Sequence, residues 1–274
     1  MPTHFSEHIY RKDWPVEGAK AAVVLVHGQA EHCGRHEYAA RALNARGYSV
    51  YAGDLPGHGR SGGLRGHIDR FDDYVDTVAD WIEDARRREP GLPTFLLGHS
   101  VGGLIAARYV ETRSEAANLA GVVLTSPAFR VRYPIPAWKT ALSLKLDGLL
   151  PRLRMPTGLH KQRVTRNEEV VRATAADPLV VAVASIRFYN ELLRAQAAAL
   201  RDAERVRLPL LLLHGGADEI IDPTVSLEFG RATASADRDV RLVPGLHHEI
   251  MNEPERDDVL RDIADWLDAR ATVG

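Results

Sequence analysis

One serine lies between two glycines at the point where a predicted strand meets a predicted helix. Residues 94–97 read as a buried strand, residues 98–102 have the sequence GHSVG, and residues 100–111 have the composition of a helix. A serine on such a sharp turn has a strained backbone, and its hydroxyl is exposed beside the positive end of a helix. The G-x-S-x-G pattern in this context predicts that Ser100 is a nucleophile. A helix-capping serine between packing glycines is the structural alternative.

A serine hydroxyl becomes a good nucleophile when a base takes its proton, and a carboxylate must orient that base. In a fold with this turn, the expected order along the chain is serine, acid and histidine, each in a loop after a strand. The apolar run at 208–218 ends at Asp218, and Glu219 and Asp222 compete with it. We favour Asp218 because it comes just after a pair of glycines, where the chain turns off the strand.

The last apolar run of the chain leads to the base. Residues 239–245 read as a strand, and the loop after them carries His247 and His248. The gap from Asp218 to this loop leaves room for one helix and one strand, as the expected order requires. Either histidine satisfies this spacing.

Acyl transfer also requires hydrogen-bond donors for the oxyanion of the tetrahedral intermediate. The apolar run at 21–28 leads into Gln29, and a loop of this form supplies one backbone amide. Val101, the residue after the nucleophile, supplies the other amide. An ordinary turn at the end of a strand is the alternative for the first loop.

These loops need a sheet to hold them, and apolar runs alternate with amphipathic segments along the chain. Apolar runs without polar alternation are typical of strands covered on both faces, as in a mostly parallel sheet. The runs lie at 21–28, 48–54, 94–100, 120–127, 208–218 and 239–245. Apolar residues at helical spacing over 71–85 and 259–267 indicate helices. The alternation predicts an α/β fold with a mostly parallel, doubly wound sheet.

One long segment breaks the alternation. Residues 127–205 contain no strand-like run but several helical pieces separated by prolines. We interpret 127–205 as an inserted helical cap, or lid, and 1–126 together with 206–274 as the core of one α/β domain.

The composition limits the partners and the cofactors. The chain has 274 residues with 35 basic against 37 acidic side chains, so its net charge gives no reason to expect a nucleic-acid partner. Cys33 is the only cysteine, which excludes an intramolecular disulfide and a cysteine-rich metal site. No metal or organic cofactor is implied. Without a signal-like N-terminus or a long apolar stretch, we expect a soluble, cytoplasmic protein.

On these residues, the chain resembles the α/β-hydrolase superfamily, and within it the monoacylglycerol lipase and lysophospholipase-like branch. The resemblance runs from about Val23 to Leu267. Its most specific segments lie at 27–36, 54–63, 92–103, 177–179, 214–218 and 244–256. The resemblance implies an α/β-hydrolase fold with a helical cap.

The resemblance also implies a set of catalytic residues. The implied triad is Ser100, Asp218 and His248, where His248 is preferred as the fourth residue of a G-x-x-H pattern in the last of those segments. The implied oxyanion hole consists of the backbone amides of Gln29 and Val101.

Members of this branch order the polar end of the substrate with a glutamate and an arginine, which correspond to Glu31 and Arg35. The chain departs from the branch at two nearby positions. His36 replaces the usual aromatic residue, and Met251 replaces a histidine found in mammalian monoacylglycerol lipases. We interpret Cys33, which has no charged motif around it, as an inert thiol.

The predicted cap carries an apolar stripe at helical spacing. Its residues are Trp138, Leu142, Leu146, Leu149 and Leu150. Such a stripe packs on the domain beneath it, holds an acyl chain or enters a lipid surface. Residues 128–166 also carry nine Lys or Arg against one acid, Asp147, which suits either a solvated face or docking to anionic lipid. Transient, peripheral contact of the cap with a membrane surface is therefore a hypothesis.

The preferred function is a serine ester hydrolase that cleaves monoacylglycerols or similar single-chain lipid esters through an acyl-enzyme. A carboxylesterase or a lysophospholipase with another ester preference is the alternative, because the fold does not choose among them. A non-catalytic ligand receptor is disfavoured because all three triad residues are present. The expected partner is a small lipid ester, and no oligomeric state is predicted.

Overall fold

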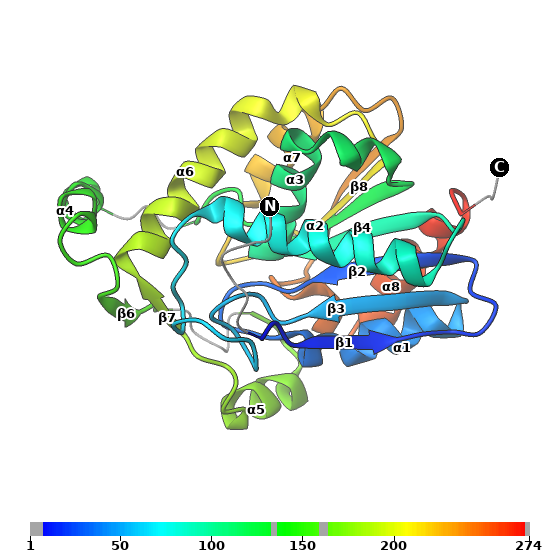
Figure 1. The fold of residues 1–274 in the computed structure, drawn as a ribbon, viewed down its shortest axis with the longest axis horizontal. Coiled ribbons are helices and arrows are strands. Elements are labelled where there is room, and N and C mark those ends of the chain that lie inside the picture. The colour runs from blue at the N-terminus through cyan, green and yellow to red at the C-terminus, as the bar shows by residue number, and fades with distance from the viewer. Residues whose placement is uncertain (1–7, 133–135, 159–163, 272–274) are drawn as a thin grey trace.

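The computed structural model describes residues 8–132, 136–158 and 164–271, which form a sheet flanked by helices (Figure 1). The strand order is β1-β3-β2-β4-β5-β8-β9, and neighbours are parallel except for β1, which pairs antiparallel with β3. The strands are β1 (Arg11–Trp14), β2 (Ala21–Val26), β3 (Tyr48–Gly53), β4 (Thr94–His99), β5 (Gly121–Thr125), β8 (Leu210–Gly215) and β9 (Arg238–Val243). Five of the predicted runs contain a parallel strand and the sixth, 239–245, overlaps β9, so the predicted mostly parallel sheet is confirmed.

Helices cover both faces of this sheet. They are α1 (Glu37–Ala45), α2 (Phe71–Arg88), α3 (Val101–Thr112), α7 (Pro223–Ala232) and α8 (Arg256–Asp268). The helix predicted over 71–85 is confirmed as α2, which has Asp72 and Asp73 in its first turn and arginines in its last turn. These charges complement the helix dipole at both ends. Helices α1 and α8 share one core cluster, and α2, α3 and α7 share the other.

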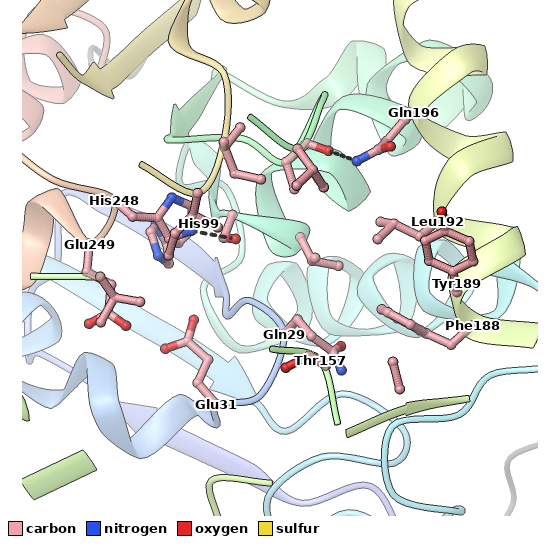
Figure 2. A pocket seen from close by; sticks show the side chains of 18 residues that line it. Gln29, Glu31, His99, Thr157, Phe188, Tyr189, Leu192, Gln196, His248 and Glu249 are labelled. Carbon is pink, nitrogen blue, oxygen red and sulfur yellow. Dashed lines mark hydrogen bonds between the residues drawn. The ribbon is translucent and has the colours of Figure 1, made fainter. Parts of the chain in front are cut away.

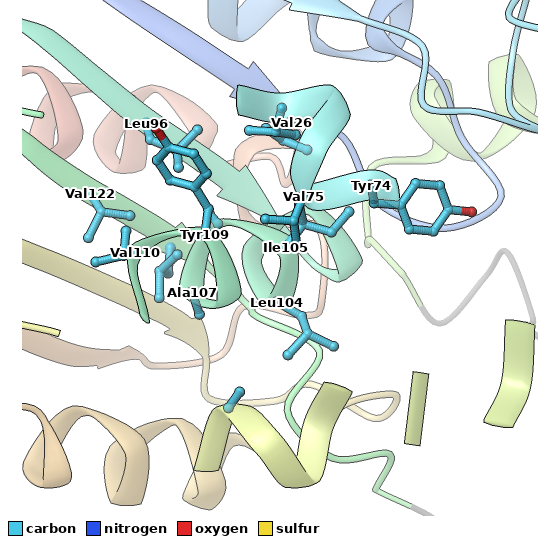
Figure 3. Packing of buried hydrophobic residues seen from close by; sticks show 14 of the residues in the cluster. Val26, Tyr74, Val75, Leu96, Leu104, Ile105, Ala107, Tyr109, Val110 and Val122 are labelled. Carbon is cyan, nitrogen blue, oxygen red and sulfur yellow. The ribbon is translucent and has the colours of Figure 1, made fainter. Parts of the chain in front are cut away.

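The central strands are buried on both faces because their side chains alternate between two apolar clusters. Val24 of β2 and Leu96 of β4 belong to the cluster beneath α2 and α3, and Val23 and Phe95 belong to the cluster beneath α1 and α8. Figure 3 shows strand residues packed against Ile105 and its neighbours on α3. Each fully buried Val or Leu contributes about 1.5–3 kcal/mol, so this sheet is a rigid platform for the loops at its edge.

The segment between β5 and β8 lies at the carboxyl ends of the parallel strands (Figure 1). It contains α4 (Ala137–Asp147), β6 (Arg154–Pro156), α5 (Glu168–Ala176), β7 (Val183–Ser185) and α6 (Ile186–Asp202). The expectation of no strand in 127–205 is wrong, because β6 and β7 form a two-stranded antiparallel sheet. These strands are short, and β6 is exposed, so an apolar run could not reveal them.

Helix α6 joins this segment to the core. Its first turn is capped by the Ser185 hydroxyl, which accepts from the backbone amide of Phe188 at 3.0 Å. Further along, Ala195 and Ala199 are buried in the same cluster as α3. The second half of α6 therefore packs against the core helix α3. The boundaries of the cap at 127 and 205 stay a prediction.

Short 3₁₀ turns complete the described chain at η1 (Cys33–His36), η2 (Ser114–Asn118), η4 (Ala203–Arg205) and η5 (Ile250–Asn252). None of the helices within the described ranges combines the length and the hydropathy needed to cross a bilayer.

Candidate active site

Ser100 occupies the turn between β4 and α3, with φ 54° and ψ −118°, a conformation that L-residues rarely adopt. The flanking glycines permit this turn. A Cβ on Gly98 would lie 2.4 Å from the carbonyl oxygen of Gly102, and a Cβ on Gly102 would lie 2.2 Å from that of Val26. The strained corner that the sequence predicts is therefore present, and Ser100 lines a cavity at this edge of the sheet.

Side chains from two distant loops meet Ser100 at this corner. The Ser100 hydroxyl donates to Nε2 of His248 at 2.9 Å, and Nδ1–H of His248 donates to Oδ2 of Asp218 at 2.7 Å. Asp218 follows β8, and the backbone amides of Ile220 and Ile221 donate to its Oδ1 at 2.7 and 3.0 Å. The structure thus brings the three predicted triad residues together in the order nucleophile, base and acid.

The competing residues are placed differently. Asp222 caps α7, because its Oδ1 accepts from the backbone amide of Thr224 at 3.0 Å. Glu219 is exposed, and neither Glu219 nor His247 lines the cavity. The Ser100 hydroxyl is hydrogen-bonded to His248 and, within the described residues, not to His247.

The charges in this chain of hydrogen bonds suit a general base. Burial alone would raise the pKa of Asp218, but His248 and His214 outweigh it and hold that pKa well below its usual range. Burial alone would lower the pKa of His248, but the charge of Asp218 and the hydrogen bond to it raise the pKa instead. An ionised Asp218 therefore supports a histidine that readily takes a proton.

The loop after β2 passes directly against the nucleophile. A Cβ on Gly28 would lie 2.9 Å from the Cβ of Ser100. His27 holds this loop in place, since its Nδ1 lies 2.8 Å from the carbonyl oxygen of Gly28 and its Nε2 accepts from the amide of Leu55 at 2.9 Å. The loop is thus fixed close to the hydroxyl of Ser100.

The side chain of Gln29 is anchored on both sides. Its Oε1 lies 2.9 Å from Nε2 of His58, and its Nε2 donates to the carbonyl of Val183 in β7 at 3.1 Å. Val101 is the first residue of α3, so its backbone amide has no acceptor within the helix. Gln29 and Val101 both line the cavity beside Ser100, and their role as oxyanion donors stays a prediction.

A buried ion cluster lies behind this loop. Glu31 accepts from the amide of Gly28 at 2.5 Å and from Nη1 of Arg35 at 2.9 Å. Arg35 also binds both carboxylate oxygens of Glu249, at 2.9 and 2.8 Å, and donates to Thr174 at 2.9 Å. Both carboxylates line the cavity, whereas Arg35 does not. Of the two predicted substrate-binding residues, the structure therefore places only Glu31 at the cavity.

The carboxylates of this cluster are ionised. Burial alone would raise the pKa of Glu31, but His36 and Arg35 beside it hold that pKa well below its usual range. Burial acts in the same direction on Glu249, and Arg35 again outweighs it and lowers the pKa. By contrast, burial lowers the pKa of His99, the neighbour of Ser100, to about 4, so this ring is neutral near pH 7. The polar end of the cavity therefore presents two carboxylates, whose negative charge the Arg35 guanidinium balances in part.

The cavity has a volume of about 220 Å³ and two unlike ends. Figure 2 shows Glu31 and Glu249 on the side of His248, with residues of α6 on the opposite side. The aliphatic and aromatic lining consists of Val101, Ala128, Val131, Val164, Ala184, Phe188, Tyr189, Leu192, Ile220 and Ile221. Such a cavity can hold an apolar chain at one end and a hydrogen-bonding group at the other.

Several residues that contact the site residues were not predicted from the sequence. No role was assigned to His58 or His214 from the sequence, yet His58 contacts Gln29 and His214 contacts Asp218. Their location in segments 54–63 and 214–218 of the family resemblance was the available signal. Glu249 also lies in such a segment, 244–256, but no local pattern indicated its pairing with Arg35, which is 214 residues away in the sequence.

Two further expectations concern the cysteine and metals. Cys33 is buried, burial raises the pKa of its thiol well above the usual range, and it does not line the cavity. Such a thiol is a poor nucleophile near neutral pH. Across the described residues, no group of three His, Cys, Asp or Glu side chains is arranged to hold a metal ion.

Known proteins resemble this chain along most of its length. The family model described as serine aminopeptidase, S33 matches residues 17–255. Phospholipase YtpA of Bacillus subtilis is 36% identical over 249 residues, which cover 90% of this chain and 95% of that protein. The monoacylglycerol lipase of Mycolicibacterium smegmatis is 34% identical over 261 residues, which cover 92% and 90% of the two chains.

A solved structure agrees with the fold described above. The crystal structure of Paleococcus ferrophilus monoacylglycerol lipase matches with a TM-score of 0.87 and 34% sequence identity, over 96% of this chain and 99% of that one. With the family model covering most of the sequence, the chain belongs to the serine aminopeptidase S33 family of α/β hydrolases.

Proposed function

We propose that this protein is a serine ester hydrolase that cleaves monoacylglycerols, or similar single-chain lipid esters, to a fatty acid and glycerol. The observation that carries the proposal is the hydrogen-bonded chain from Ser100 through His248 to Asp218 beside an apolar cavity. The likeness to monoacylglycerol lipases over nearly the whole chain supports the substrate class.

The reaction proceeds in two halves. The Ser100 oxygen attacks the ester carbonyl while Nε2 of His248 takes the hydroxyl proton, and Asp218 stabilises the imidazolium. The oxyanion accepts hydrogen bonds from the amides of Gln29 and Val101. His248 then gives its proton to the departing glycerol oxygen, the ester C–O bond breaks and an acyl-enzyme remains. Water attacks this ester with His248 as base, the fatty acid leaves, and Ser100 regains its proton.

The apolar end of the cavity supports an acyl chain as the bound group. Phe188 and Leu192 project from α6, Val131 lines the cavity from the segment after β5, and Ile221 lines it from the loop after β8. Transfer of each CH₂ group of an acyl chain from water to such a surface contributes about 0.8 kcal/mol. A chain of several carbons therefore provides enough binding free energy to favour lipid esters over acetyl esters.

The polar end supports a neutral head group. Glu31 and Glu249 present ionised carboxylates there, while among the described residues that line the cavity there is no Lys or Arg. Glycerol hydroxyls can donate to these carboxylates, whereas a phosphate would face like charge. This contrast favours monoacylglycerols over lysophospholipids with anionic heads, although the similarity to phospholipase YtpA makes a lysophospholipase the second candidate.

Labelling with a fluorophosphonate probe tests the nucleophile. The purified protein should be labelled at Ser100, and the Ser100→Ala variant should not be labelled. Labelling at another residue would mean that Ser100 is not the nucleophile, and no labelling would leave a ligand-binding protein with a hydrolase fold.

A matched pair of substrates tests the head group. Monooleoylglycerol and oleoyl lysophosphatidic acid share the ester and the acyl chain but differ in the phosphate. We expect kcat/KM to be higher for the glycerol ester by about 10-fold or more, since like charges at a buried site cost several kcal/mol. The Glu249→Gln variant should narrow this difference, because it removes one negative charge. A preference for the phosphate ester in the parent protein would select the lysophospholipase instead.

We also propose that the exposed face of the cap docks transiently on anionic lipid. The large side chains of this face, with their exposed fractions, are Trp138 64%, Leu142 46%, Leu144 51%, Leu149 78%, Leu150 49%, Leu153 47% and Met155 55%. Lys139, Lys145, Arg152 and Arg154 are exposed among them. Figure 1 shows α4 projecting away from the sheet. Of the basic residues expected in this region, Lys161 and Arg163 lie outside the described residues.

Co-sedimentation with vesicles tests this docking. Binding should be stronger to phosphatidylcholine vesicles that contain phosphatidylserine than to pure phosphatidylcholine vesicles, with about 1 kcal/mol from each basic residue near the surface. Added salt should weaken the difference, because it screens exposed charges. Equal binding to both vesicles, or none, would contradict the proposal.

A further inference from the structure

Asp218 has a second histidine partner outside the predicted triad. Its Oδ2 lies 2.9 Å from Nε2 of His214, and the same oxygen lies 2.7 Å from Nδ1 of His248. His214 belongs to β8, and its side chain is completely buried. One carboxylate oxygen therefore accepts hydrogen bonds from two imidazole rings.

The other nitrogen of His214 determines which tautomer is present. Its Nδ1 lies 2.7 Å from Oγ of Ser226, which is buried in α7. Burial lowers the pKa of His214, so the ring is neutral and carries one N–H. Because Asp218 can only accept, that N–H is on Nε2, and the Ser226 hydroxyl donates to Nδ1. The chain of hydrogen bonds thus continues past the acid, from Asp218 to His214 and Ser226.

We propose that His214 is a positioning residue that acts through Asp218 and tunes how strongly the carboxylate holds a proton on His248. A hydrogen bond to a carboxylate stabilises its negative charge and reduces its attraction for another proton. His214 and His248 share one oxygen, so the N–H of His214 weakens the pull of Asp218 on the His248 imidazolium. This inference rests on the proposed serine mechanism.

The surroundings allow this effect to be isolated. The backbone amides of Ile220 and Ile221 hold Oδ1 of Asp218, so the carboxylate keeps its place when the bond from His214 is removed. In the described part of the chain, His248 is also acted on by Ser100, His99, Glu31 and Glu249. His214 itself faces Asp218, Ser226 and His248, with Asp222 nearby. The proposed variants leave all of these groups unchanged.

The test is the pH dependence of Ser100 activation in variants at position 214. We would measure the rate constant for fluorophosphonate labelling, and kcat/KM for monooleoylglycerol, from acid to neutral pH. In His214→Leu, Asp218 gives its full charge to His248, so the acid limb of both profiles should move to higher pH by about half a unit or more. In His214→Gln the amide nitrogen lies where Nε2 lies in histidine, so the limb should return toward that of the parent.

A matched control and a second variant complete the experiment. His67 lies 2.8 Å from the Ser185 hydroxyl and 3.2 Å from Asp69, away from the triad, so His67→Leu should leave the limb in place. If His214→Leu does not fold by circular dichroism, His214→Asn replaces it. The amide of this asparagine matches the position of Nδ1, so it keeps the hydrogen bond to Ser226, but it does not reach Asp218. The acid limb should therefore move to higher pH, as in His214→Leu.

Two results would separate this inference from the proposed function. A limb that stays in place or moves to lower pH in a folded position-214 variant means that His214 is only structural, and it overturns the inference while the serine mechanism stands. A parent protein that the probe does not label at Ser100 overturns the proposed function itself. Labelling of the parent together with an upward movement supports both.

Discussion

The core and the cap contribute unequally to the candidate active site. Ser100, Asp218 and His248 all come from turns or loops of the core. Ser100 and Asp218 follow the buried strands β4 and β8, and His248 follows the edge strand β9. The cap supplies much of the apolar wall, through Leu192 and its neighbours, and exposes large apolar side chains such as Trp138. The predicted catalytic groups thus lie in the core, and the cap adds apolar surface beside them. Core variants should therefore change kcat, and cap variants should change binding.

The largest effect is expected at the nucleophile. Ser100→Ala should lower kcat for monooleoylglycerol by about 10⁶-fold, because the acyl-enzyme can no longer form. Ser126→Ala is the matched control, since Ser126 is another buried serine with positive φ (43°) that does not line the cavity. It should keep activity near that of the parent. If Ser100→Ala kept a tenth of the activity, the core would not carry the chemistry.

A smaller effect is expected at the acid, and it depends on pH. Asp218 raises the pKa of His248, and His248 must be neutral to take the proton, so kcat/KM should fall as pH drops through this raised pKa. Asp218→Asn removes the charge, so it should lower kcat by about 10⁴-fold and move the acid limb to lower pH. Initial rates across a pH series would measure both changes. An unmoved limb would mean that another group controls the profile.

The contrast between the core and the cap also appears in what could be predicted from the sequence. The parallel strands follow from apolar runs, because a strand buried on both faces has no polar alternation. The turn at Ser100 follows from its glycines, since no other residue fits so close to the neighbouring backbone. Strand β1 (Arg11–Trp14), with the sequence RKDW, was not predicted, because an edge strand with charged side chains resembles a loop.

Side-chain partners were harder to predict than strands. Arg35 was expected at the substrate, but Glu249 binds its guanidinium, and only the folded chain brings these two residues together. His248 could be separated from His247 by the family resemblance and not by spacing, because both occupy one loop. In the cap, Trp138, Leu142 and Leu146 of the predicted stripe lie on α4, but the helix ends at Asp147, before Leu149 and Leu150. Helical spacing also does not tell whether such a stripe faces protein or solvent. Tertiary contacts decide such questions, and a local pattern does not contain them.

In the cap, the wall of the cavity should affect selectivity more than turnover. Leu192→Ser places a polar group where the acyl chain lies, and kcat/KM for long-chain monoacylglycerols should fall about 10-fold while short-chain esters change little. A series of monoacylglycerols of increasing chain length would show this. Leu64→Ser is the control, because Leu64 is exposed on the core and does not line the cavity. Equal losses for all chain lengths would place the acyl chain elsewhere.

The smallest effect on stability is expected at the exposed face of the cap. Trp138 is 64% exposed, so Trp138→Ala should change the free energy of unfolding by less than about 0.5 kcal/mol. The same change at Trp81, which is 1% exposed in the core, should cost about 3–5 kcal/mol. Urea denaturation would measure both. Trp138→Ala should nevertheless weaken sedimentation with anionic vesicles, because the tryptophan is free to enter the lipid. If it destabilised the protein as much as the core change, the face would be packed against protein, and the contrast between the two regions would fail.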